Sequence, residues 1–249
     1  MKKLIKKIFK KAGYDIVPAG KPSPVVLKHN PDSMVIALTR NNKLIKKPSS
    51  VIDLGAAQGN WTKSVLQIWP DANYLLFEPL AEREPDLQKL KNEKANVDFV
   101  MAAAGAAPAS IRFNVTDDLD GSGFYSAAEG GRYTTRNVRV TTVDSEIKNK
   151  KLKGPFILKF DTHGFEIPIL AGAKNVLPET ELIVMECYGF ILSPECKLFP
   201  EMCMQLDQLG FRLSDIIKIE RRPGDSVFWQ CDAIFLRKEN PVYQNNNYR

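Results

Sequence analysis

The sequence lacks any long hydrophobic run. No apolar stretch approaches the ~20 residues that a membrane-spanning helix requires, and lysines interrupt the first apolar residues, so we expect no secretory signal. Only four cysteines occur among 249 residues, and no two of them form a C-x-x-C pair. Because this number and spacing do not suit a disulfide framework, we expect reduced thiols and a cytoplasmic protein.

A general excess of basic residues is also missing. Lysine and arginine outnumber aspartate and glutamate by 35 to 29, but six of the lysines lie within the first eleven residues, which contain no acid. Without these six lysines, basic and acidic residues are equal in number. Since nucleic-acid enzymes usually spread basic charge along their binding face, we expect no nucleic-acid partner.

The basic N-terminal segment has an apolar side. Residues 1–12 are predicted to form an amphipathic helix. Its apolar residues share the side opposite the lysines: Leu4, Ile5, Ile8 and Phe9. Such a helix suits peripheral contact with an anionic membrane through residues 1–11, so the cytoplasmic protein would be membrane-associated. The alternatives are a frayed solubilising tail and a helix that packs on the rest of the protein.

Beyond this segment the chain changes from proline-rich to regular. We expect residues 13–48 to form an arm or linker, with a helix or strand near residues 33–41, and residues 241–249 to form a tail. Between them, over residues 49–240, short apolar runs alternate with helical patterns. Strands are predicted at residues 51–54, 73–77, 97–103, 156–160, 182–185, 211–219 and 227–236, and helices at 60–69, 81–92, 165–177 and 198–209. This alternation predicts one α/β domain with a doubly wound, mostly parallel seven-stranded sheet.

The first predicted strand ends in a turn of small residues. Residues 51–60 are V-I-D-L-G-A-A-Q-G-N. Glycines let the backbone approach a ligand closely, and ligands of open α/β sheets lie beyond the carboxyl ends of the strands. We therefore expect this turn to contact a cofactor through Asp53, Gly55, Ala56, Gln58 and Gly59.

The turn departs from the dinucleotide fingerprint G-x-G-x-x-G. Ala57 occupies the position that this fingerprint needs as its second glycine. The departure disfavours an oxidoreductase that uses a nicotinamide or flavin dinucleotide, which we retain as an alternative on a related sheet.

Two further candidates lie at the ends of the next strands. Glu78 follows Asp53 by 25 residues and ends the second predicted strand. An acid at this place can accept hydrogen bonds from both ribose hydroxyls of a nucleoside, and its alternative role is a surface cap. Ala103 ends the third predicted strand, so we expect it beside the same cofactor.

The segment 156–166 brings acid and imidazole together. An apolar strand ends at Phe160 and is followed by Asp161 and His163, directly before a predicted helix. Both side chains should lie at the ligand edge of the sheet. A histidine beside a carboxylate is a candidate general base, and the alternative is a histidine that hydrogen-bonds the loop backbone.

These segments resemble the FkbM-like methyltransferases. That family has a strand ending in K-x-D-x-E/Q-G-x-E and then a helix ending in L-x-G-A. The corresponding residues are Lys159, Asp161, Gly164 and Glu166, followed by Leu170, Gly172 and Ala173. Residues 53–56 (D-L-G-A), 77–79 (F-E-P) and 141–144 (T-T-V-D, close to T-T-L-D) also match, so the resemblance extends from about residue 51 to residue 186.

The resemblance implies a function. It implies S-adenosyl-L-methionine (SAM) as cofactor, with Asp161 beside it, and O-methylation of a hydroxyl on a sugar, glycan or other small metabolite. It also implies that the Gly-rich loop at residues 117–131, between strands predicted at 110–115 and 137–142, closes over the site. His163 departs from the family, which has Glu or Gln there. A non-catalytic peripheral-membrane protein on the same fold is therefore a further alternative.

Glu186 ends the fifth predicted strand at the same edge. We expect it to act with Asp161 and His163 in catalysis, by orienting the acceptor or balancing the sulfonium charge. Two carboxylates and an imidazole also suit a divalent ion, but the chain has no compact ligand motif, so we expect no metal. The acids of the Gly-rich loop belong either to a lid or to a solvated loop: Asp117, Asp118 and Asp120.

Overall fold

The computed structural model describes residues 33–124 and 133–247. The helix predicted for residues 1–12, its membrane contact and residues 13–32 of the expected arm lie outside this part of the chain. Among the described helices, none has the length and apolar character needed to cross a membrane.

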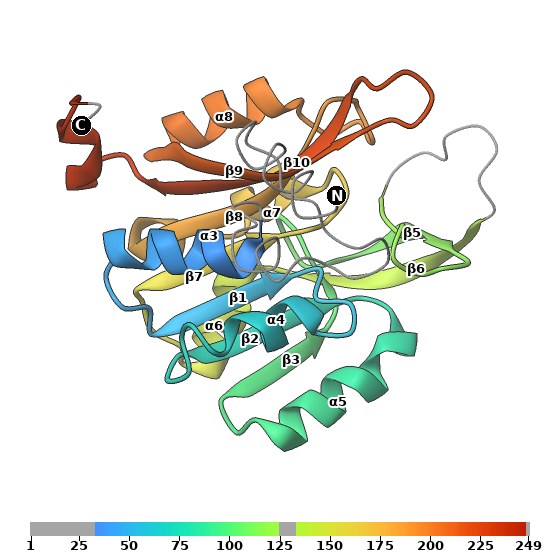
Figure 1. Cartoon of the computed structure of the whole chain (residues 1–249). Helices are drawn as coiled ribbons and strands as arrows, with labels where there is room; N and C mark the ends of the chain where they lie inside the picture. Colours follow the sequence, from blue (N-terminus) through green and yellow to red (C-terminus); the bar gives the residue numbers. More distant parts are fainter. Residues whose placement is uncertain (1–32, 125–132, 248–249) are drawn as a thin grey trace, which may run out of the picture.

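A seven-stranded sheet forms the centre of the molecule (Figure 1). Its strands are β1 (Ser50–Leu54), β2 (Asn73–Glu78), β3 (Val97–Met101), β7 (Phe156–Phe160), β8 (Thr180–Tyr188), β9 (Phe211–Arg221) and β10 (Phe228–Arg237). They lie in the order β3-β2-β1-β7-β8-β10-β9. All neighbours from β3 to β8 are parallel, whereas β10 is antiparallel to β8 and β9. This topology confirms the predicted doubly wound, mostly parallel α/β fold.

Helices cover both faces of this sheet. Residues from α3 (Met34–Asn41), α4 (Asn60–Val65) and α5 (Glu84–Glu93) pack on one face, and residues from α6 (Val143–Lys150), α7 (Glu166–Ala171) and α8 (Phe199–Gln208) pack on the other. Short 3₁₀ segments are η1 (Asn42–Leu44), η2 (Ala81–Arg83), η3 (Leu177–Glu179) and η4 (Pro241–Gln244). Successive side chains of a strand point to opposite faces of the sheet. Val51 therefore packs on the face covered by α3, α4 and α5, and Ile52 packs on the face covered by α6, α7 and α8. Burial on both sides explains why β1 and β7 are mainly apolar, with Ser50, Asp53 and Lys159 as their polar residues.

A second, three-stranded sheet adjoins the first. It consists of β4 (Ala103–Ala104), β5 (Ala109–Thr116) and β6 (Tyr133–Thr141), with β5 and β6 antiparallel, and it confirms both β segments expected around the Gly-rich loop. Figure 1 shows it on the side towards which β1 points. The strand predicted for residues 97–103 is divided, because Ala103 pairs with Val140 of this small sheet and not with β2.

Two helices are shorter than predicted. The α4 helix ends at Val65 and is followed by a tighter turn, in which the Ile68 N–H donates to the Val65 carbonyl oxygen at 2.9 Å, while the Tyr74 hydroxyl donates to the Trp69 carbonyl oxygen at 2.9 Å. The α7 helix stops before Gly172, where a Cβ atom would lie 2.0 Å from the Gly105 carbonyl oxygen. Close backbone packing therefore ends the helix at this point.

The α6 helix was not predicted. Its N-cap Thr142 accepts a hydrogen bond from the Ser145 backbone N–H at 3.1 Å. Acidic residues occupy its first turn and lysines its last turn, which complements the helix dipole. Local capping therefore defines a helix whose apolar pattern is weak.

The α3 helix joins the arm to the main core. Leu38 is fully buried in the cluster that contains Val51 and Tyr74, and the Asn41 side chain donates to the Ala37 carbonyl oxygen at 2.9 Å. Residues 34–41 are thus part of the hydrophobic core that supports the sheet.

We predict that Leu38→Ala lowers the free energy of unfolding by about 2–5 kcal/mol, because it removes a buried side chain and leaves a cavity. The control is Leu44→Ala, since Leu44 is 37% exposed and should change stability by less than about 0.5 kcal/mol. Chemical denaturation followed by circular dichroism measures both. Equal losses in the two variants would contradict the role assigned to α3.

Candidate active site

The carboxyl ends of the central strands enclose a cavity of about 380 Å³. The residues predicted for the site that line it are Gly55, Gln58, Glu78, Ala103, Asp161, His163 and Glu186. Strand ends from β1, β2, β7 and β8 therefore contribute to a single cavity, as parallel topology requires.

The Gly-rich turn after β1 is fixed by its neighbours. Gly55 and Gly59 have φ angles of +80° and +71°, which favour glycine. The Gly55 N–H donates to the Phe77 carbonyl oxygen at 3.1 Å, and a Cβ atom on Gly55 would lie 1.9 Å from the Asp161 carbonyl oxygen. The turn is therefore held between the ends of β2 and β7.

Glu78 connects the turn after β1 to the segment that follows β2. Its Oε2 accepts a hydrogen bond from the Ala57 N–H at 2.8 Å, and its Oε1 accepts one from the Leu80 N–H at 2.9 Å. Burial raises the pKa of the Glu78 carboxyl, although both backbone donors and the nearby Arg83 oppose this shift. The side chain is 5% exposed, so its orientation is fixed by the backbone on both sides.

Three predicted cofactor contacts do not line the cavity: Asp53, Ala56 and Gly59. Asp53 is fully buried, and its Oδ2 accepts a hydrogen bond from the Thr62 hydroxyl at 2.7 Å. Burial raises the pKa of this carboxyl. Asp53 thus links the end of β1 to α4.

Lys159 connects Asp53 to the cavity. Its Nζ lies 3.4 Å from Asp53 Oδ1 and 3.0 Å from Asp161 Oδ2, and it donates to the Gly55 carbonyl oxygen at 3.3 Å. Burial alone would lower the pKa of Lys159, but the carboxylates of Asp161 and Asp53 raise it above its ordinary value. The side chain is therefore a permanently charged brace between two acids.

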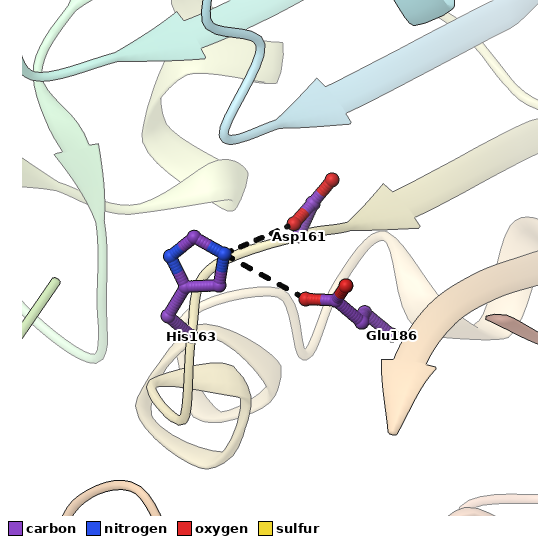
Figure 2. Close-up of side chains that lie close together, drawn as sticks. All are labelled: Asp161, His163 and Glu186. Carbon is purple, nitrogen blue, oxygen red and sulfur yellow. Dashed lines mark ion pairs between the residues drawn. The ribbon is translucent and has the colours of Figure 1, made fainter. Parts of the chain in front are cut away.

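Asp161, His163 and Glu186 form a cluster at the cavity (Figure 2). The Nε2 atom of His163 lies 3.6 Å from Asp161 Oδ1 and 3.7 Å from Glu186 Oε2. His163 has a φ of +51°, which is uncommon outside glycine, and its Nδ1 lies 3.0 Å from the Ser122 carbonyl oxygen. The loop carbonyl therefore orients the imidazole so that Nε2 faces both carboxylates.

The charges of this cluster are interdependent. Burial and the Asp161 carboxylate raise the pKa of Glu186 to about 8, although His163 opposes this shift. Burial would raise the pKa of Asp161, but Lys159 and His163 lower it to about 2. Burial would lower the pKa of His163, but Asp161 and Glu186 raise it. Asp161 is consequently ionised at neutral pH, whereas the pKa values of Glu186 and His163 are both raised.

The sequence did not predict several residues that complete the site. Tyr188 donates its hydroxyl hydrogen to Glu186 Oε2 at 2.7 Å, and the Gln230 amide donates to Glu186 Oε1 at 2.7 Å. Tyr188 follows Glu186 by two residues in the same strand, a spacing that could have identified it. Gln230 comes from β10, and no local pattern reveals its partner.

The described part of the Gly-rich loop lies against the cavity. Asp120 lines the cavity and pairs with the buried Arg83, whereas Asp118 accepts a hydrogen bond from the Thr116 hydroxyl within the loop at 2.6 Å. Phe124 packs on Phe165, with ring centroids 4.0 Å apart. Only one of the three acids noted in this loop thus lines the cavity.

The sheet order, with its antiparallel β10, and the glycine turn beside an acid at the end of β2 define a Rossmann-like methyltransferase. A family model described as "Methyltransferase FkbM domain" matches residues 41–213, well over half of the chain. The protein therefore belongs to the FkbM methyltransferase family, as the sequence motifs indicated. No curated protein matches the chain.

Similar solved structures include three methyltransferase-type proteins. An FkbM methyltransferase from Methylobacillus flagellatus has 12% identity and a TM-score of 0.48, over 76% of this chain but only 44% of its own. An rRNA methylase from Streptococcus thermophilus has 11% identity and a TM-score of 0.46, over 88% and 99% of the two chains. Fibrillarin from Aeropyrum pernix, with natively bound SAM, has 12% identity and a TM-score of 0.45, over 76% and 68%. The chain thus spans less than half the length of the Methylobacillus protein.

We predict that Gly55→Ala destabilises the protein and impairs its cavity. A left-handed backbone costs a non-glycine residue about 1–2 kcal/mol, and the added Cβ atom would also overlap the Asp161 carbonyl oxygen. The matched control is Gly224→Ala, because a Cβ atom at Gly224 has no atom within 4 Å. Thermal unfolding compares the two, and equal melting temperatures would show that the turn tolerates a side chain.

Proposed function

We propose that the protein is a SAM-dependent methyltransferase that methylates a hydroxyl group of a sugar, glycan or other small metabolite. Membership of the FkbM family supports methyl transfer. The observation that carries the proposal is that one cavity is lined both by Glu78 and by the cluster of Asp161, His163 and Glu186. A nucleoside site and a site for hydroxyl chemistry therefore adjoin.

The polar residues of the cavity fit the cofactor. Two backbone N–H groups hold the Glu78 carboxylate in place, and each of its oxygens keeps a lone pair that can accept a ribose hydroxyl. Gln58 and Asn60 also line the cavity, and their amides supply donors and acceptors for an amino-acid group. These groups suit the nucleoside and methionine parts of SAM.

The apolar residues of the cavity fit a base. The lining includes Phe77, Leu80, Ala103 and Ala104, whose side chains offer apolar contacts for adenine. The cavity volume of about 380 Å³ lies within the range of small-molecule sites. Apolar and polar residues both line the cavity, so it can hold a base and the polar groups of a nucleoside together.

The cluster serves the acceptor hydroxyl. When bound, SAM supplies an electrophilic methyl group on a sulfonium. Lys159 keeps Asp161 ionised, and Ser122 directs His163 Nε2 into the cluster, so that a hydroxyl placed there meets fixed hydrogen-bond acceptors. Proton removal by a positioned group contributes about 10²- to 10⁴-fold to rates. Alignment of hydroxyl and methyl contributes more, on the order of 7–11 kcal/mol at best.

The charge balance supports a small, uncharged acceptor. Outside the first eleven residues, basic and acidic residues are equal in number, which favours a sugar-like hydroxyl over RNA. The dinucleotide oxidoreductase is disfavoured by Ala57, at the position of the second glycine of that fingerprint. Parallel titrations with SAM and NAD separate these two classes.

We predict that Glu78→Ala weakens SAM binding by about 1.5–3 kcal/mol, or roughly 10- to 100-fold in Kd, because it removes charged hydrogen-bond acceptors from the ribose. Isothermal titration calorimetry measures the change. Glu84→Ala is the matched control, since Glu84 is exposed on α5. Unchanged affinity in a folded Glu78→Ala protein would exclude Glu78 from the cofactor site.

We predict that Asp161→Asn lowers the rate of methyl transfer by about 10²- to 10⁴-fold while the protein stays folded, because it keeps the shape of the side chain and removes its charge. A substitution of His163 should be less damaging or comparable. Mass spectrometry of a methylated acceptor, with Asp86→Asn as the exposed control, reports the rates. Near-normal turnover by Asp161→Asn would refute the proposed arrangement.

A further inference from the structure

Three metal-ligating side chains converge at the cavity. Asp161, His163 and Glu186 each offer one ligand atom, and the three atoms lie within 4.8 Å of one another. Figure 2 shows the imidazole and both carboxylates pointing towards a common centre. Two carboxylates and an imidazole form a ligand set that first-row divalent metals accept.

The imidazole is oriented as a metal ligand would be. His163 Nδ1 lies 3.0 Å from the Ser122 carbonyl oxygen, so a neutral ring carries its hydrogen on Nδ1 and its lone pair on Nε2. Metal-bound histidines almost always donate their other N–H in this manner. The Nε2 distances of 3.6 and 3.7 Å to Asp161 and Glu186 are too long for hydrogen bonds. The lone pair therefore faces the centre without a hydrogen bond to either carboxylate.

Both carboxylates accept hydrogen bonds from neighbouring side chains. Lys159 donates to Asp161 Oδ2 at 3.0 Å, which leaves Oδ1 directed at the centre. Gln230 and Tyr188 donate to the two oxygens of Glu186, each at 2.7 Å. Outer hydrogen bonds of this kind fix the ligands of metal sites. All three candidate ligands thus have such a partner.

We propose that Asp161, His163 and Glu186 bind one divalent cation of the Mn²⁺ or Zn²⁺ class. Metal–ligand bonds of about 2.0–2.2 Å place neighbouring ligand atoms roughly 3–3.5 Å apart, so the distances of 3.6 and 3.7 Å need only small shifts. The cation also places positive charge between Asp161 and Glu186, beside the Lys159 ammonium that pairs with Asp161. Three protein ligands leave coordination positions open towards the cavity.

The role of the cation in catalysis rests on the proposed function. A divalent cation lowers the pKa of a hydroxyl beside it. Because the cluster side chains then bind the cation and do not act as the base, the acceptor proton leaves to water. The new O–C bond forms as the S–C bond of the sulfonium breaks, and the electron pair of that bond stays on sulfur. Binding to the cation would thus both position the acceptor hydroxyl and make its oxygen more nucleophilic.

Mn²⁺ is the probe for this site. Full-length protein is first treated with EDTA and dialysed, and Mn²⁺ binding is then measured by electron paramagnetic resonance. We expect one Mn²⁺ per chain and an electron spin-echo modulation from one imidazole nitrogen. The variants are Glu186→Gln and His163→Asn, because asparagine tolerates the positive φ at this position. The matched controls are Glu84→Gln and, for the only other histidine, His29→Asn.

The expected results separate the site from the proposed function. Both cluster variants should bind Mn²⁺ at least tenfold more weakly, and His163→Asn should lose the nitrogen signal, while both controls keep it and circular dichroism confirms folding. Absence of stoichiometric Mn²⁺ binding by the unmutated protein, or Mn²⁺ binding by the cluster variants equal to that of the unmutated protein, overturns the metal site. SAM affinity is measured on the same samples. If the unmutated protein binds Mn²⁺ but does not bind SAM, the proposed function is refuted and the metal site stands.

Discussion

The ammonium group of Lys159 lies between the carboxylates of Asp53 and Asp161, and the rest of the site depends on this contact. Asp53 and Lys159 are register partners on β1 and β7, so the central pair of strands itself aligns the charges. A buried charge without a partner costs several kcal/mol. The same ammonium donates to the Gly55 carbonyl oxygen. One cation therefore fixes two strand ends and the glycine turn, and the cavity is formed where these three meet.

The antiparallel strand β10 contributes a side chain that orients one of the carboxylates at the ends of the parallel strands. The parallel strands deliver Asp161 and Glu186 to one edge, but parallel topology alone does not orient Glu186. Because β10 runs antiparallel to β8, Gln230 pairs with Tyr188, and both side chains donate to the Glu186 carboxylate. A residue near the end of the chain thus orients a carboxylate at the centre of the site.

The strand ends and their chemistry could be predicted because periodicity defines where buried strands stop. Glu78, Asp161 and Glu186 were expected at one edge, and they line one cavity. Asp53 was expected beside the cofactor but does not line the cavity, because side-chain alternation places it on the face of the sheet where it contacts Thr62 of α4. Arg83 could not be predicted, since its pairing with Asp120 joins segments that only the three-dimensional fold brings together. Local sequence identifies the strand ends at which the site lies, whereas the long-range pairing of strands and loops decides which side chains form hydrogen bonds and ion pairs with the site residues.

The contact between Ser122 and His163 joins the Gly-rich loop to the ends of the central strands. Ser122 belongs to the Gly-rich loop, outside the main sheet, yet its carbonyl oxygen is the partner of Nδ1. If Ser122 moves away from the cavity, the imidazole loses that partner and can rotate or change tautomer. The orientation of this histidine is therefore coupled to the position of a loop that lies outside the main sheet.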